Sequence, residues 1–218
     1  MIMPGLGNAS GRAVRNAILN GSESMPVFRQ NQILATNKYN YPEIDGEHSQ
    51  EQDLANTNPL YSSGDSSYSY NCQRCVVAYE ARRRGFDVHA KPYLFQLADT
   101  LPYEDEDVGW PSVFENSKIE YCGAQDASDV KNNIHNMMAS WGEGARAIVS
   151  VDFRCGGGHV FVAEYLNGGV RYMDPQNARN DVECYFDAID TTTAGILRTD
   201  NCDFTERILE CCEGAVND

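Results

Sequence analysis

Basic residues are scarce in this chain of 218 residues. It has 17 Lys and Arg against 32 Asp and Glu, so its formal net charge is 17 − 32 = −15. A protein that binds nucleic acid needs a basic face to neutralise phosphates, and the only tight basic run is Arg82–Arg84. We therefore expect no nucleic-acid partner. We interpret the run as a solvated helix face with one arginine paired to a nearby acid, because charge runs usually face water.

Long apolar runs are also absent. No stretch approaches the roughly 20 apolar residues of a membrane-spanning helix, and Met1–Gly5 lacks the charged-then-apolar order of a signal peptide. These absences predict a soluble protein with no membrane partner. The length is typical of one domain.

Aromatic residues are few in residues 1–60, which are rich in Asn, Gln, Ser and Glu. This composition predicts a polar arm, or the end of a preceding module, that wraps on the domain or is partly disordered. Apolar residues at i, i+3 and i+4 predict a short helix in the arm, over Gly11–Leu19. We place the domain itself at residues 61–218.

The sequence also lacks the second half of a zinc site. Cys72-x-x-Cys75 has the spacing of metal ligands, but no second such pair and no His pair follows it, so we expect no metal. The other cysteines are Cys122, Cys155, Cys184, Cys202, Cys211 and Cys212. Reduced thiols are favoured over disulfides, because a chain of this size without a visible secretion signal has little need of cross-links.

From residue 68 onward, helix and strand signals alternate. Asn71 is a preferred N-cap, Cys72–Arg84 forms the predicted first helix, and Gly85 can end it. Phe86–Lys91 then alternates as a strand does, and Ser128 can cap a second helix. The apolar face of that helix is predicted to contain Val130, Ile134, Met137, Met138 and Trp141.

The second half of the chain predicts an antiparallel sheet, so the fold class is α+β. Asn167–Gly169 is a strong hairpin turn, because asparagine and glycine tolerate positive φ. The predicted strands are Ala145–Phe153, His159–Tyr165, Val170–Met173 and a run near Gly195–Leu197. Short helices are predicted over Tyr185–Ile189 and Thr205–Cys211.

Three chemically competent residues fall at the ends of these elements. Cys72 begins a helix, where free N–H groups and the helix dipole stabilise a thiolate and an oxyanion. His159 begins a strand, and its imidazole is suited to take the thiol proton. With the hairpin turn near residue 168, the partner of His159 falls near residue 176 or 177, so Asp174 lies within its reach. Cys72, His159 and Asp174 would complete a nucleophile, a base and an orienting acid.

Each of these residues also has an ordinary interpretation. A cysteine often fills a core, a histidine before a strand is often only a satisfied polar residue, and Asp-Pro is a common turn. Their combination and the hairpin register favour the catalytic interpretation. Gly158 and Gln176 are secondary candidates for contact with substrate or oxyanion.

The same residues carry a resemblance to a known family. The segment Asn71–Val88, then Gly157–Phe161, then Asp174–Gln176 resembles the papain-fold toxin family of glutamine deamidases. Such domains occur in bacterial polymorphic toxins and at the C-termini of phage minor head proteins of the Mu F type. The similarity covers about residues 61–200, and it implies a papain-like fold, a Cys-His-Asp triad, hydrolysis of an amide and no cofactor. It also implies a protein substrate that presents a glutamine side chain and, for a toxin, an immunity protein.

The sequence leaves open which cysteine is the nucleophile and which reaction the protein catalyses. The family pattern contains both cysteines: the position of Cys72 at the helix start favours it, whereas papain-like proteases carry another cysteine three residues before the helix-initial one, which favours Cys75. A peptidase would use the same triad on a backbone amide. A lone Cys-x-x-Cys also occurs in thioredoxin-like oxidoreductases, and an interaction module of a virion could retain the fold without activity.

Overall fold

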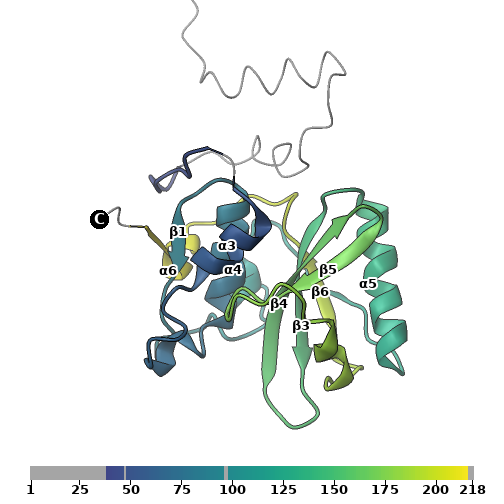
Figure 1. Cartoon of the computed structure of the whole chain (residues 1–218). Helices are drawn as coiled ribbons and strands as arrows, with labels where there is room; N and C mark the ends of the chain where they lie inside the picture. Colours follow the sequence, from purple (N-terminus) through teal and green to yellow (C-terminus); the bar gives the residue numbers. More distant parts are fainter. Residues whose placement is uncertain (1–37, 47, 96–97, 216–218) are drawn as a thin grey trace, which may run out of the picture.

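The structure is a computed structural model that describes residues 38–46, 48–95 and 98–215. On one side lie helices α3 (Gln50–Thr57) and α4 (Cys72–Arg83) with a small sheet, in which β1 (Val88–Ala90) pairs with β7 (Cys212–Gly214). On the other side lies a five-stranded sheet, flanked by α5 (Ala127–Trp141) (Figure 1).

The larger sheet is antiparallel throughout, with the strand order β2-β6-β3-β4-β5. Its strands are β2 (Glu120–Tyr121), β3 (Arg146–Asp152), β4 (Gly158–Leu166), β5 (Gly169–Met173) and β6 (Gly195–Arg198). Short helical turns connect these elements: η2 (Ser66–Tyr68), η3 (Trp110–Val113), η4 (Glu183–Asp187) and α6 (Ile208–Cys211).

The larger sheet is covered on both faces. Val160 and Val162 of β4 pack in the core that includes α4, whereas Phe161 and Ala163 between them pack in the core that includes α5. This alternation follows from the two-residue period of a strand. The predicted α+β class is confirmed, and the sheet holds α4 along one of its faces.

The predicted hairpin between β4 and β5 is confirmed. Its two turn residues, Asn167 and Gly168, have φ values of 54° and 76°, and Leu166 faces Gly169 across the turn. Positive φ at both central residues is typical of the tight turn that matches the twist of paired strands.

Of the two predicted helix caps, Asn71 is at the N-cap position of α4, whereas the one at Ser128 is wrong. The side chain of Asn71 accepts no hydrogen bond from a backbone N–H of α4; it contacts Asn58, Lys91 and the thiol of Cys75 instead. Helix α5 begins at Ala127, and the side chain of Asp126 accepts a hydrogen bond from the backbone N–H of Asp129. Asp126 is therefore the N-cap of α5, in place of the predicted Ser128.

The interpretation of the basic run as a solvated face is also wrong, because all three arginines are buried. Arg82 pairs with Asp53 and Asp87, and Arg83 pairs with Asp53 and with Glu164 of β4. Arg84 pairs with Glu80, which also binds Arg146 of β3. Two of these acids are local, because Glu80 precedes Arg84 by four residues and Asp87 follows Arg82 by five, whereas Asp53 and Glu164 come from segments distant in the sequence.

Part of the polar arm lies in the described region and packs on the domain. Tyr41 is buried, and α3 buries Asp53, Leu54 and Thr57 on its side facing α4. A capping box between Ser49 and Gln52 starts α3. The helix predicted over Gly11–Leu19 lies outside the described residues.

Candidate active site

Cys72 is the first residue of α4, and 6% of it is exposed. The carbonyl oxygen of Asn71 accepts the first helical hydrogen bonds, from the N–H groups of Arg74 (2.9 Å) and Cys75 (3.0 Å). The N–H groups of Cys72 and Gln73 precede these and have no acceptor within the helix. Together with the helix dipole, they favour negative charge at this position.

Cys75, one turn further along α4, is fully buried. Its thiol donates a hydrogen bond to Oδ1 of Asn71 over 3.3 Å. Burial raises the pKa of Cys75 well above its usual value, and the neighbouring negative charges of Cys72 and Asp174 raise it further. A protonated thiol without access to solvent is a poor nucleophile.

His159 lies between Cys72 and Asp174. Its Nε2 donates a hydrogen bond to Oδ2 of Asp174 over 3.0 Å, and the Cys72 side chain lies close enough to the imidazole to raise its pKa. Burial alone would lower the pKa of His159, but the hydrogen bonds and charges of Asp174 and Cys72 outweigh it and raise the pKa to about 10. The imidazole is therefore protonated at neutral pH.

Aromatic rings fix the plane of this imidazole. The centroid of His159 lies 6.2 Å from that of Phe153 and 6.3 Å from that of Phe161, both nearly parallel to it. Tyr185 approaches edge-on at 5.7 Å. Such a frame restricts rotation of His159 and keeps its Nε2 directed at Asp174.

Asp174 is fully buried, and both of its carboxylate oxygens are hydrogen-bonded. Oδ1 accepts from the backbone N–H of Gln176 over 2.9 Å. Oδ2 accepts from His159, from Nδ2 of Asn177 over 2.9 Å and from the hydroxyl of Tyr185 over 2.8 Å. Sequence reasoning missed Asn177 and Tyr185; Asn177 directly follows the Asp-Pro-Gln motif, whereas the position of Tyr185 carries no local signal.

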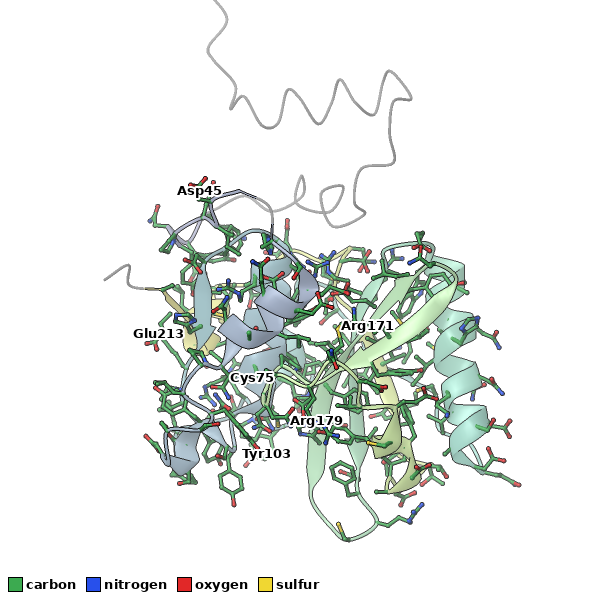
Figure 2. The ribbon with its side chains drawn as sticks, in the orientation of Figure 1. Asp45, Cys75, Tyr103, Arg171, Arg179 and Glu213 are labelled. Atoms are coloured by element: carbon green, nitrogen blue, oxygen red, sulfur yellow. The ribbon has the colours of Figure 1, made fainter. Side chains whose placement is uncertain are left out.

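The β4–β5 hairpin brings His159 and Asp174 together, as its register predicts. β5 ends at Met173, and the chain then folds into a loop closed by two backbone hydrogen bonds between Asp174 and Arg179 (2.8 and 3.1 Å). Figure 2 labels Arg179 at the end of this loop and Cys75 on α4, both where the helices meet the sheet. The site therefore forms on the boundary between the two halves of the molecule.

The two secondary candidates lie in this region as well. Gln176 is 8% exposed, and its Nε2 has no hydrogen-bond partner in the described part of the chain. Gly158 pairs with Asp152 of β3, and a side chain at Gly158 would meet Oδ1 of Asp152 at 3.0 Å. Contact of Gly158 with a substrate stays a prediction.

Comparison with protein families adds to this geometry. Residues 70–179 match the family described as papain fold toxin 1, glutamine deamidase. The match covers 179 − 70 + 1 = 110 of the 218 residues, which is just over half. The chain belongs to this family. The resemblance and the papain-like fold that the sequence predicts are confirmed, and membership of a glutamine deamidase family implies an enzyme that acts on amides. A search of curated proteins and a search of solved structures found no match.

Disulfides, metal sites and membrane spans each place requirements on the described residues. All eight cysteines are free thiols in the structure, including Cys72 and Cys75. Residues 38–46, 48–95 and 98–215 contain no group of three or more His, Cys, Asp or Glu side chains placed to hold a metal ion. Within the same residues, no helix is long and apolar enough to cross a membrane.

Proposed function

We propose that this protein is a cysteine amidohydrolase that deamidates a glutamine side chain of a target protein. Cys72 is the nucleophile, His159 the general acid and base, and Asp174 the residue that orients His159. The observation that carries the proposal is the imidazole of His159, which is hydrogen-bonded to Asp174 and interacts with the Cys72 side chain closely enough for its pKa to rise. Family membership supports the choice of glutamine over other amides.

The reaction follows from the charges of this pair. The Cys72 thiolate attacks the carboxamide carbon, and the carbonyl oxygen becomes an oxyanion. The imidazolium of His159 donates its proton to the departing nitrogen, so ammonia leaves and a thioester remains. Neutral His159 then takes a proton from water, which attacks the thioester and releases glutamate and the thiolate. The net reaction consumes one water and produces one carboxylate and one ammonium ion.

Oxyanion stabilisation is assigned to two donors. The N–H groups at the start of α4 have no acceptor within the helix, so they can donate hydrogen bonds to the oxyanion. The Nε2 group of Gln176 is the second donor, because a buried amide without a partner costs free energy until something binds it. A substrate oxyanion satisfies that requirement.

The buried state of Cys75 supports Cys72 as the nucleophile. Its raised pKa and its hydrogen bond to Asn71 keep Cys75 protonated and held in place. Cys75 therefore serves as a matched control, since it is a cysteine on the same helix, one turn away.

The test is to incubate the protein with glutamine-containing proteins and peptides and to measure ammonia release and product mass. We expect deamidation without chain cleavage. Cys72→Ala should abolish ammonia release, with a loss of about 10⁴-fold or more, whereas Cys75→Ala should keep most of it. Cleavage of the peptide chain would identify a peptidase instead. Equal activity of Cys72→Ala and wild type would exclude the mechanism.

The family description as a toxin supports a target in another cell. An immunity partner and a place in a phage head remain predictions.

A further inference from the structure

Asn58 connects two segments of the candidate site. It follows α3, lies before the residues that match the family, and is 6% exposed. Its Nδ2 donates hydrogen bonds to the carbonyl oxygens of Gln176 (2.8 Å) and Tyr68 (2.9 Å). An amide nitrogen carries two protons, and these two short contacts account for both.

The same side chain also meets the residue that precedes Cys72. The amides of Asn58 and Asn71 contact each other in both directions, with each nitrogen 3.3 Å from the opposite oxygen. Asn71 in turn donates to the carbonyl oxygen of Lys91 over 3.0 Å and accepts the hydrogen bond from the thiol of Cys75. Asn58 therefore supports the residue whose carbonyl oxygen begins α4.

The other end of this connection reaches Asp174. Gln176 accepts from Asn58 through its carbonyl oxygen and donates its N–H to Oδ1 of Asp174. One side chain thus joins the start of the helix that carries Cys72 to the loop that carries Asp174. These two segments are more than 100 residues apart in the sequence and belong to different halves of the fold.

The position of this contact along α4 is what gives it a role. The other polar contacts that the described residues make between α4 and β4 join Tyr79 and Arg83 to Glu164. Tyr79 is seven residues beyond Cys72, or about 10 Å at the rise of an α-helix. These contacts hold the far part of the helix, whereas near its start the two halves are connected by Asn58 and by the approach of Cys72 to His159.

We propose that Asn58 is a positioning residue that sets the distance between Cys72 and the His159–Asp174 pair. This inference rests on the proposed function and adds to it that the active site includes a residue from the arm. Reacting groups that move by about 1 Å can lose roughly 100-fold in rate. Without Asn58, the two halves keep their separate cores, but the first turn of α4 is no longer tied to the Asp174 loop.

The experiment uses the full chain with Asn58→Ala and Asn58→Asp. The aspartate variant keeps the shape of the side chain but replaces the NH₂ group with an oxygen. It therefore has no hydrogen-bond donor to offer the two carbonyl oxygens. We expect kcat for glutamine deamidation to fall about 10- to 100-fold, with KM changed much less. Asn56→Ala is the matched control, because Asn56 is an exposed asparagine of α3 whose hydrogen bond to His89 uses its backbone oxygen, which the substitution keeps.

A second readout separates positioning from mere stability. Alkylation of Cys72 by iodoacetamide, followed by peptide mass mapping, reports how readily this thiol reacts. In the wild type and in Asn56→Ala, we expect the same rate at neutral pH. In the Asn58 variants, the rate should fall severalfold, because Cys72 is no longer held beside His159.

Several outcomes overturn the inference. They are wild-type kcat and wild-type alkylation in the Asn58 variants, a lowered melting temperature as the only change, or the failure of both variants to fold, which would make the role structural. If the wild type deamidates no substrate, the proposed function fails by itself. The alkylation profile of Cys72 would still show whether Asn58 positions it.

Discussion

The two ends of α4 use buried polar groups in opposite ways. At the C-terminal end, Arg82, Arg83 and Arg84 meet carboxylates at short distances. At the N-terminal end, Cys72 faces a single imidazole, and the nearby amide groups of Gln73 and Gln176 each contain an atom without a partner in the described chain. One end thus has its charged groups in ion pairs within the fold, while the other retains amide atoms that a substrate can use. We infer that the first end stabilises the fold and the second provides reactivity.

Among the substitutions that test this comparison, Glu80→Gln should have the largest effect, and it should act on the free energy of unfolding. Glu80 binds Arg84 at 2.7 Å and Arg146 at 2.8 Å, and all three side chains are buried. Loss of the carboxylate leaves two buried guanidinium groups without their counter-charge, so the free energy of unfolding should fall by about 3–5 kcal/mol. Urea denaturation measures this, and the activity of the folded fraction should be nearly unchanged.

The control for Glu80→Gln is Glu51→Gln. Glu51 pairs with Arg171 at a similar distance of 2.9 Å, but both side chains are substantially exposed. An exposed ion pair contributes less than about 1 kcal/mol, so this variant should unfold near the wild-type midpoint. Equal destabilisation by the two substitutions would contradict the structural role of burial at the arginine end of α4.

The two ends should also respond to opposite ranges of pH. Burial alone would raise the pKa of Glu80, but Arg146 and Arg84 outweigh it and lower the pKa from 4.5 to about 2. Because folding lowers the pKa of Glu80, its ion pairs with Arg84 and Arg146 stabilise the fold above pH 4.5. This stabilisation is lost as the pH falls toward 2. Acid unfolding of the wild type should therefore have a Glu80 component that is absent in Glu80→Gln.

At the Cys72 end the sign is reversed. The pKa of His159 is raised from 6.5 to about 10, so its contribution to stability is complete below pH 6.5 and disappears as the pH rises toward 10. Deamidation should be lost over the same alkaline range, because neutral His159 has no proton to give to the leaving nitrogen. NMR titration of the His159 ring protons measures this directly, and a midpoint near 6.5 would contradict the assignment.

The smallest expected effect is that of Tyr185→Phe. This change removes one of the hydrogen bonds to Oδ2 of Asp174 and keeps the ring beside His159. A hydrogen bond to a charged group contributes about 1.5–3 kcal/mol, and the lower figure corresponds to a roughly tenfold fall in kcat. Tyr121→Phe, at an exposed tyrosine, is the control. No difference between the two variants would show that Asn177 and Gln176 suffice to orient Asp174.

Sequence reasoning succeeded where the relevant contact is local. Asn167–Gly168 specifies a tight turn, and a tight turn sets the strand register, so the proximity of His159 and Asp174 follows from counting along a hairpin. Blocks of residues at the helix start and the hairpin also indicated the family, which the match confirms.

It failed where distant segments compete for the same side chain. Asn71 is at the predicted N-cap position of α4, but Asn58 and Lys91 bind its side chain in place of a helical N–H group. Arg82–Arg84 resembles a solvated charge run, but acids from α3, α4 and β4 enclose it. Local propensity loses in each case, because a buried polar group must find its partner wherever the fold provides one.

By itself, the sequence determined the α+β class, the hairpin and the identity of the residues that can do chemistry, because turn preferences and the periods of helix and strand act over a few residues. Only the tertiary structure decided that Cys75 is enclosed, that Tyr185 and Asn177 complete the surroundings of Asp174, and that the arm reaches the site through Asn58. Burial and hydrogen bonding between distant segments depend on how the helices pack against the sheet, and no short stretch of sequence contains that information.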